Sequence, residues 1–273
     1  MSLTLGTSPF SGAPAGRFNS TPDPPGRPLY LDPLPYRVRA LIAGETVLDS
    51  DRASLLHETG HLPVIYAPLA DYRADLLAPS STTTHCPYKG DARYHHVRVG
   101  DRERPDAIWS YPEPLASAHW LAPLAALRFD AADTWFCEDA EINGHARDPY
   151  HRIDLFPTSR HVRIAIDGVE LASSTGALML CETGLPRRFY LPADDVVCDL
   201  FEPSAKHTRC AYKGVASYRT ARIGDRVVPD IAWSYPIAAP EVGAIEGRWC
   251  FFDEHVDLDL DGVRQARPTS PWS

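Results

Sequence analysis

Two glutamates occupy equivalent places in two similar stretches of the chain. Glu58 and Glu182 are 124 positions apart, and each follows an apolar run, with Leu56 and Leu180 two residues earlier. Because alternate residues of a strand share a face, each carboxylate is expected beside leucines and partly buried. Burial raises the pKa of a carboxyl group and suits it to general acid or base catalysis. The alternative is structural, with the carboxylate accepting backbone N–H bonds at the Glu-Thr-Gly turn that follows.

Each copy also has a cysteine followed three residues later by a lysine, as Cys86 with Lys89 and Cys210 with Lys213. Residues 86–94 are predicted to form one strand, which sends the cysteine to one face and the lysine to the other. One cavity would then use either the cysteine or the lysine, unless a bulge brings both to the same side. The cysteine is a candidate nucleophile or a small buried hydrophobe. The lysine is a candidate ligand-binding group or an ion-pair partner.

Aromatic residues recur around these positions and are candidate ligand-binding walls. They are Tyr88, Tyr94, Trp109 and Tyr111 in the first copy, and Tyr212, Tyr218, Trp233 and Tyr235 in the second. Tyrosine and tryptophan bring a polar group that needs a partner when buried, so they suit a mixed apolar and polar pocket. The alternative is that they belong to the core.

These residues lie within a long internal repeat. Residues 82–112 and 206–236 have similar sequences. Corresponding residues are 124 positions apart, from Arg37 and His161 onward. After the two Trp-Ser-Tyr-Pro blocks the register is expected to shift by one residue, so that Phe129 corresponds to Phe252. A period this long predicts two domains, at residues 36–155 and 160–273, fused as a pseudo-twofold pair. Residues 1–35 form a Pro- and Gly-rich arm that is expected to form neither helix nor ladder.

Each copy is predicted to be mostly β, as a small sandwich or open barrel. Asp167-Gly168 between two apolar runs indicates a hairpin, and a second hairpin is expected to turn near Gly224-Asp225. Residues 176–182 have apolar side chains at both odd and even positions, so both faces of the expected strand are apolar and the strand is expected to be buried. Residues 70–80 and 193–204 indicate short helical turns stopped by a proline.

The order of motifs Glu-Thr-Gly, Cys-x-Tyr-Lys-Gly and Trp-Ser-Tyr-Pro resembles the bacterial and fungal domain-of-unknown-function family number 427, here as a tandem pair over nearly the whole chain. The resemblance implies a β-tent-like topology, two antiparallel sheets meeting at an angle, as in methionine sulfoxide reductase B and the thalidomide-binding domain of cereblon. That fold as a rule holds zinc with paired C-x-x-C motifs. This chain has none, so no structural zinc and no cofactor are expected. The resemblance implies no established activity.

Other motifs and the composition exclude several classes. The net charge of −9 argues against a nucleic-acid partner, and no apolar run is long enough to span a membrane. Six scattered cysteines and an N-terminus without a secretory pattern predict a cytoplasmic protein. The Asp-Leu-Asp-Leu-Asp-Gly stretch imitates a calcium loop, but Pro268 occupies its twelfth position, so an alternating strand is expected. Histidines that crowd the first copy leave open a metal site private to it: His57, His61, His85, His95, His96 and His119.

The sequence therefore predicts one small pocket per domain that binds or acts on a small polar metabolite. In an enzyme, Glu58 and Glu182 would be the acid or base, and Cys86 and Cys210 the nucleophile or a wall. The alternatives are a non-catalytic binding module, similar to the cereblon-type pocket, or a purely structural scaffold. The two pockets are expected to differ. The second is expected to be more enclosed. In the first, the imidazole of His57 would tune the pKa of Glu58 differently if a bulge or a strand end lets it reach the carboxylate.

Overall fold

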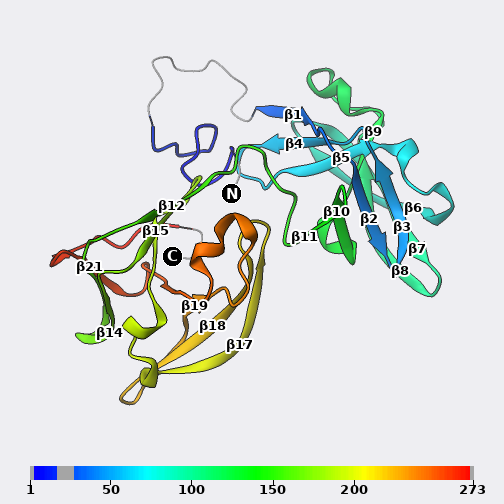
Figure 1. The fold of residues 1–273 in the computed structure, drawn as a ribbon. Helices are drawn as coiled ribbons and strands as arrows, with labels where there is room; N and C mark the ends of the chain where they lie inside the picture. Colours follow the sequence, from blue (N-terminus) through cyan, green and yellow to red (C-terminus); the bar gives the residue numbers. More distant parts are fainter. Residues whose placement is uncertain (1–2, 17–27, 271–273) are drawn as a thin grey trace. The chain divides into compact units, whose positions relative to one another are not determined.

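The computed structural model describes residues 3–16 and 28–270 (Figure 1). The chain divides into two compact units, called here the first domain, built around Pro9–Asp148, and the second domain, which begins at Pro149. Both are mostly β with antiparallel sheets and only short helices, as the sequence predicts. Within the described residues, no helix is long and apolar enough to cross a membrane.

The first domain has a seven-stranded sheet and a four-stranded sheet (Figure 1). The larger sheet has the order β1 (Leu29–Pro33), β4 (Ser54–Glu58), β5 (Val64–Pro68), β9 (Leu124–Leu127), β8 (Arg102–Ser110), β7 (Gly90–Val99) and β6 (Leu77–Cys86). The smaller sheet has the order β11 (Ala140–Ile142), β10 (Thr134–Cys137), β2 (Val38–Ile42) and β3 (Glu45–Ser50).

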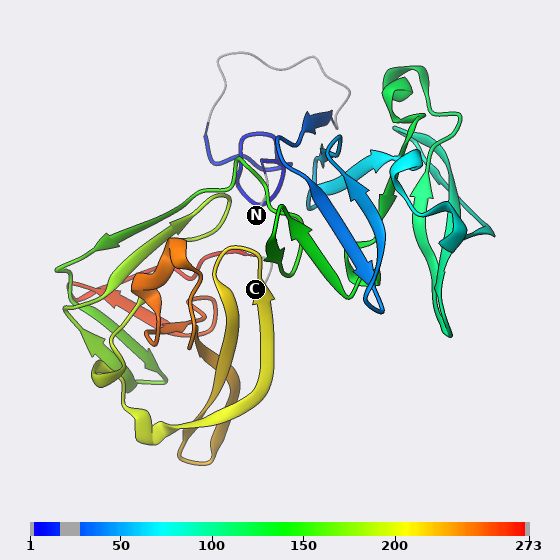
Figure 2. The same ribbon diagram turned by 45° about the vertical axis from the view of Figure 1, so that its right-hand side comes forward.

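The second domain has three sheets, and its long β17–β18 hairpin is drawn in yellow in Figure 2. The first sheet contains β12 (Ile153–Pro157), β15 (Leu178–Glu182) and β16 (Arg188–Tyr190). The second contains β17 (Phe201–Cys210), β18 (Gly214–Ile223), β19 (Arg226–Ser234) and β20 (Trp249–Phe251). The third has the order β14 (Val169–Ser174), β13 (Val162–Ile166), β21 (Asp257–Leu260) and β22 (Val263–Arg264).

The two domains share one topology. The seven-stranded sheet of the first corresponds to the three-stranded sheet plus the β17–β20 sheet of the second. Leu191 and Trp249 still join those two sheets through a pair of backbone hydrogen bonds, of 2.8 and 2.9 Å. The difference is therefore a shortened β16–β20 ladder rather than a change of fold.

The predicted hairpins are confirmed. Asp167 and Gly168 connect β13 to β14 with φ of 50° and 82°, the left-handed pair that a tight two-residue hairpin requires. Gly224 and Asp225 connect β18 to β19. The predicted helical turns are present as 3-10 helices, η1 (Leu69–Asp71), η2 (Ala74–Leu76), η5 (Ala193–Asp195) and η6 (Cys198–Leu200). They are not stopped by proline, because the prolines lie inside the following strands β6 and β17.

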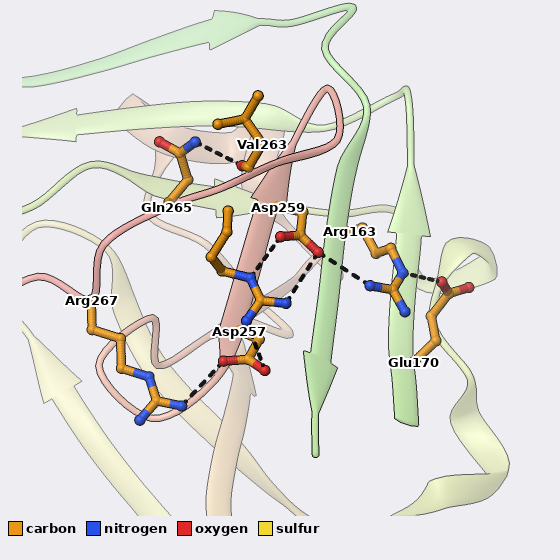
Figure 3. Close-up of polar contacts among 8 residues, drawn as sticks. Arg163, Glu170, Asp257, Asp259, Val263, Gln265 and Arg267 are labelled. Carbon is orange, nitrogen blue, oxygen red and sulfur yellow. Dashed lines mark hydrogen bonds and ion pairs between the residues drawn. The ribbon is translucent and has the colours of Figure 1, made fainter. Parts of the chain in front are cut away.

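The Asp-Leu-Asp-Leu stretch forms β21, as predicted, and its acidic side chains pair with arginines (Figure 3). Asp259 lies 3.1 Å from Arg163 and 2.6 Å from Arg264. Asp257 lies 2.9 Å from Arg264 and 3.2 Å from Arg267. The alternation places the leucines in the core and the aspartates in an ion-pair network across the sheet surface.

The expectation that the N-terminal arm forms no ladder is wrong for its last part. Leu29–Pro33 forms β1, an edge strand paired with β4 from Leu29 opposite Glu58 to Pro33 opposite Ser54. Proline is tolerated there because it ends an edge strand. Leu31 packs against a small apolar cluster that includes Leu56 and Tyr66, and Leu34 is buried in the main core. Residues 17–27 of the arm lie outside the described residues.

Each domain has two apolar clusters, on opposite faces of its larger β layer. The main core of the first domain takes side chains from both sheets, including Leu55, Ile65 and Ile108. Their strand neighbours Leu56 and Tyr66 point to the other face, into a smaller cluster covered by η3 (Ala116–Leu121). The second domain repeats this arrangement, with η7 (Pro240–Ile245) over the smaller cluster. The predicted site residues lie on this second face.

Candidate functional site

A cleft of about 630 Å³ opens on the second face of the seven-stranded sheet. All seven residues that the sequence singles out in the first copy line it: Glu58, Cys86, Tyr88, Lys89, Tyr94, Trp109 and Tyr111. They come from β4, β7, β8 and the ends of strands nearby, so the sheet brings together residues up to 53 positions apart. Tyr66, Val64, His61 and His85 complete much of the wall.

The prediction that residues 86–94 form one strand is wrong, and the cysteine and the lysine face the same cleft. Cys86 ends β6 and pairs with Gly90, the first residue of β7. Gly90 has φ of 102°, and a Cβ there would lie 3.3 Å from the carbonyl oxygen of Glu113. Glycine is required because the turn needs a positive φ and a close approach to the next segment. The turn between the strands then projects Lys89 into the same cavity as Cys86.

Glu58 and Lys89 form a largely buried ion pair in the cleft wall. The ammonium group of Lys89 donates to Oε2 of Glu58, and the side chains of Lys89 and Glu58 are 10% and 12% exposed. The ammonium also lies 5.9 Å from the ring centre of Tyr111. The turn after Glu58 is closed by backbone, since the N–H of His61 donates to the Glu58 carbonyl at 3.0 Å. The carboxylate therefore binds a lysine rather than capping the turn.

The aromatic side chains of the cleft are fixed by their own hydrogen bonds. The indole N–H of Trp109 donates to the hydroxyl of Tyr66 at 2.9 Å, and the two rings meet edge to face. The hydroxyl of Tyr94 lies 2.9 Å from Oγ1 of Thr84. Burial raises the pKa of Tyr111, so its hydroxyl stays protonated at neutral pH. Tyr66 was not singled out from the sequence, although its counterpart Tyr190 at the same spacing of 124 was a usable signal.

The second domain carries the same set of contacts. Lys213 donates to Oε2 of Glu182, and the two side chains are 9% and 7% exposed. The indole of Trp233 donates to Tyr190 at 3.3 Å. Cys210 and Tyr235 belong to the same apolar cluster, and the hydroxyl of Tyr218 lies 2.8 Å from Oγ1 of Thr208. The residues predicted in the second copy are thus also together.

A histidine that the sequence did not point to covers this second arrangement. Nε2 of His151 lies 3.1 Å from Oε1 of Glu182, and its side chain is 1% exposed. Its ring stacks on Tyr212 with a centroid distance of 3.8 Å and planes 18° apart. His151 precedes the region where the two copies can be compared in register, so the repeat held no signal for it.

Both halves of the chain match one family description, Domain of unknown function (DUF427), at residues 30–138 and 154–262. The chain belongs to this family as a tandem pair. The resemblance inferred from the motifs is thereby confirmed. No curated protein matches the chain.

The carboxyl group of the second DUF427 domain does not have the raised pKa that the sequence suggests. Burial would raise the pKa of Glu182, but the charge of Lys213 and the hydrogen bonds from His151 and Lys213 outweigh it and lower the pKa to about 2. Burial would likewise lower the pKa of Lys213, and the charge of Glu182 raises it instead. The pair is therefore ionised at neutral pH.

The aromatic walls are more buried in the second DUF427 domain, as the sequence predicts. Three residues that are half-buried in the first domain have buried counterparts in the second: Tyr88, Tyr94 and Trp109, against Tyr212, Tyr218 and Trp233. His151 supplies part of the cover. The rest of the burial comes from residues around Trp233 that differ from those around Trp109.

The register near that tryptophan holds longer than the sequence indicates. The N–H of Arg128 donates to Ala107 at 2.8 Å, and the N–H of Phe252 donates to Ile231 at 3.1 Å. Ala107 and Ile231 are 124 positions apart, so Phe252 corresponds to Arg128 and not to Phe129. The slip occurs after β9 and β20.

This correction identifies what closes the second site. The ring of Phe252 lies 4.6 Å from that of Trp233, and Arg188 lies 5.8 Å from the same ring. Arg188 is held by Glu254 at 2.6 Å. The first domain has Val64 in place of Arg188, so it lacks this buried arginine against its tryptophan.

The imidazole of His57 does not reach the carboxylate of Glu58. His57 is adjacent in β4 and so faces the other side of the strand, where it is fully buried with Nδ1 3.7 Å from Asp148. Burial lowers its pKa, and Asp148 opposes this. The imidazole beside a site glutamate is His151 in the second domain. Among the described residues, no group of three or more His, Cys, Asp or Glu side chains is placed to hold a metal ion.

Proposed function

We propose that the first DUF427 domain binds a small polar metabolite in the cleft around Glu58 and Lys89. The observation that carries this is a largely buried ion pair in the wall of an aromatic cleft of about 630 Å³. Clefts of roughly 300–1,000 Å³ with apolar walls and a few convergent polar groups are typical small-molecule sites. A buried ion pair adds little net stability compared with apolar residues of similar volume, so its place in this wall supports recognition.

The side chains define how such a ligand is held. Tyr88, Tyr94 and Trp109 line the cleft and bring aromatic rings on which a flat ligand can stack. Lys89 donates to an acceptor or anion on the ligand, and Glu58 accepts from a donor. The ligand accordingly has a flat apolar part together with polar groups of both kinds.

Binding without catalysis fits the charge state of the duplicated site better than acid catalysis does. A general acid needs a proton at neutral pH, whereas the pKa of Glu182 is lowered to about 2 by its partners. One observation favours a second candidate, covalent catalysis: Cys86, a candidate nucleophile, lines the same cavity as Lys89 and Glu58. Loss of turnover in Cys86→Ala with ligand binding retained would support that candidate.

The binding proposal is tested by a thermal-shift screen of the full chain against a library of small polar metabolites. Hits are then titrated calorimetrically against Glu58→Gln, Lys89→Met and Trp109→Phe. We expect affinity to fall at least about tenfold in the first two variants, because each loses a charged hydrogen bond. Glu103→Gln is the matched control, since Glu103 pairs with Arg98 on the surface of the same domain. The proposal fails if no metabolite binds, or if Glu58→Gln and Lys89→Met bind every hit as the wild type does.

A further inference from the structure

The second domain shows which chemical group fits against this set of residues. His151 comes from the segment before β12, yet its imidazole is enclosed between Tyr212 and the Glu182 carboxylate. The centroid distance of 3.8 Å with nearly parallel planes is that of a fully stacked ring pair. A ring nitrogen meets the carboxylate at 3.1 Å, within hydrogen-bond range.

The two carboxylate oxygens of Glu182 have separate partners. Oε2 accepts from Lys213, and Oε1 faces His151. In the first domain Lys89 likewise donates to Oε2 of Glu58. Oε1 of Glu58 is therefore the atom that corresponds to the oxygen facing the imidazole.

Tyr88 completes the correspondence. It is the counterpart of Tyr212, it lines the cleft together with Glu58 and Lys89, and it is half-buried rather than buried. The first domain thus has the stacking ring, the carboxylate and the lysine beside a cleft. The second domain has the same three groups with an imidazole already on them.

We infer that the cleft of the first domain takes a planar nitrogen heterocycle that stacks on Tyr88 and donates a ring N–H to Glu58. In the second domain the imidazole of His151 stacks on Tyr212 in the same way and brings Nε2 to 3.1 Å from Oε1 of Glu182. This inference rests on the proposed function and names the class of its ligand. Tyr94 and Trp109 also line this cleft of about 630 Å³, which has room for a substituent on the heterocycle. Lys89 remains close to that ligand and favours a substituent with an acceptor group.

The first test uses two probes that differ in a single N–H. Benzimidazole and 1-methylbenzimidazole have the same ring system, and only the first has a ring N–H when both are neutral. We expect benzimidazole to bind the full chain, and the methylated probe to bind at least about tenfold more weakly, because it leaves the Glu58 oxygen without a donor. Glu58→Gln and Tyr88→Leu should each weaken benzimidazole binding at least about tenfold, while Glu103→Gln leaves it unchanged.

The second test opens the second domain. In the full-length His151→Ala variant, added imidazole should raise the melting temperature and bind at one site more than in the wild type, while neutral 1-methylimidazole should do neither. The first test uses wild-type protein, so it decides the inference even if His151→Ala does not fold.

The outcomes separate this inference from the proposed function. A metabolite that requires Glu58 and is not displaced by benzimidazole overturns the inference and leaves the proposed function intact. Equal binding of benzimidazole and its methylated form also overturns the inference. If no small molecule of any kind requires Glu58, both are overturned.

Discussion

The first domain surrounds its Glu58–Lys89 pair with an open cleft, whereas the second covers its Glu182–Lys213 pair with His151. The glutamate, lysine, cysteine and aromatic residues are the same in both and hold the same hydrogen bonds. What differs lies outside the shared residues, in a histidine ahead of β12 and in the residues around the tryptophan. Identical site residues therefore do not imply identical roles after a duplication. One copy keeps a cleft, and the other uses the same groups to hold its own chain.

The largest expected effect comes from leaving a buried carboxylate without its partner. Lys213→Met should lower the free energy of unfolding by about 3–5 kcal/mol, since Glu182 would be a buried charge without a cation. Lys89→Met should lower it by clearly less, because water in the open cleft can hydrate Glu58. Urea unfolding of the full-length variants measures both.

Lys206→Met is the control for this comparison. Lys206 is 45% exposed and lies 3.5 Å from Asp230, and such surface pairs contribute at most about 1 kcal/mol. If Lys213→Met and Lys89→Met lose the same free energy of unfolding, the two ion pairs are equally shielded from water. The contrast between an open first site and a covered second site would then be wrong.

Acid should destabilise the second domain through Glu182. Its folded pKa of about 2 lies below the ordinary value of 4.5, so the unfolded state binds the proton first. The stability that this group contributes is present above pH 4.5 and is lost as the pH falls toward 2, by an amount on the order of 3 kcal/mol. Unfolding free energies measured across this range should show a shallower decline in Glu182→Gln than in the wild type.

Asp253 in the same domain acts with the opposite sign. Burial, against the opposing charge of Arg188, raises its pKa from 3.8 to about 6, so its contribution is present below 3.8 and fades as the pH rises to about 6. Asp253→Asn removes this dependence and isolates that of Glu182. If the unfolding free energy of Glu182→Gln declines as steeply below pH 4.5 as that of the wild type, other carboxylates cause the decline.

His151→Ala should have a smaller effect, of about 2 kcal/mol. It removes one stacked ring and a polar contact of 3.1 Å with a buried carboxylate, but leaves the Lys213 partner of Glu182 in place. His207→Ala is the matched control, because His207 is exposed and its Nδ1 lies 3.1 Å from the neighbouring carbonyl of Ala205. Thermal unfolding of the two variants compares them, and an equal, small effect would mean that His151 does not hold the second site closed.

The fold was predictable wherever local signals decide it. The left-handed residues Asp167 and Gly168 fix their hairpin by themselves, and alternation in β21 separates leucines from aspartates without help from the rest of the chain. The prediction for Leu29–Pro33 was wrong. Its prolines suggested that the segment pairs with no other strand, whereas an edge strand tolerates proline at its end.

The candidate site was predictable in its members but not in its geometry. Repetition marked the glutamate, cysteine, lysine and aromatic positions, because both copies retain them. The turn at Gly90 depends on contact with the segment after β8, where the N–H of Leu115 donates to the Lys89 carbonyl at 3.0 Å. The pKa of Glu182 depends on His151, which is 31 residues away and outside the repeat. Such contacts are tertiary, and no local pattern contains them.

Calorimetric titration of the full chain with a ligand found in the metabolite screen tests the central claim most directly. We expect one site per chain, with affinity lost in Glu58→Gln and in Tyr88→Leu, because Glu58 and Lys89 line a cleft, whereas the buried imidazole of His151 lies against Glu182. Two equivalent sites per chain, or binding that depends on Glu182 and not on Glu58, would contradict it.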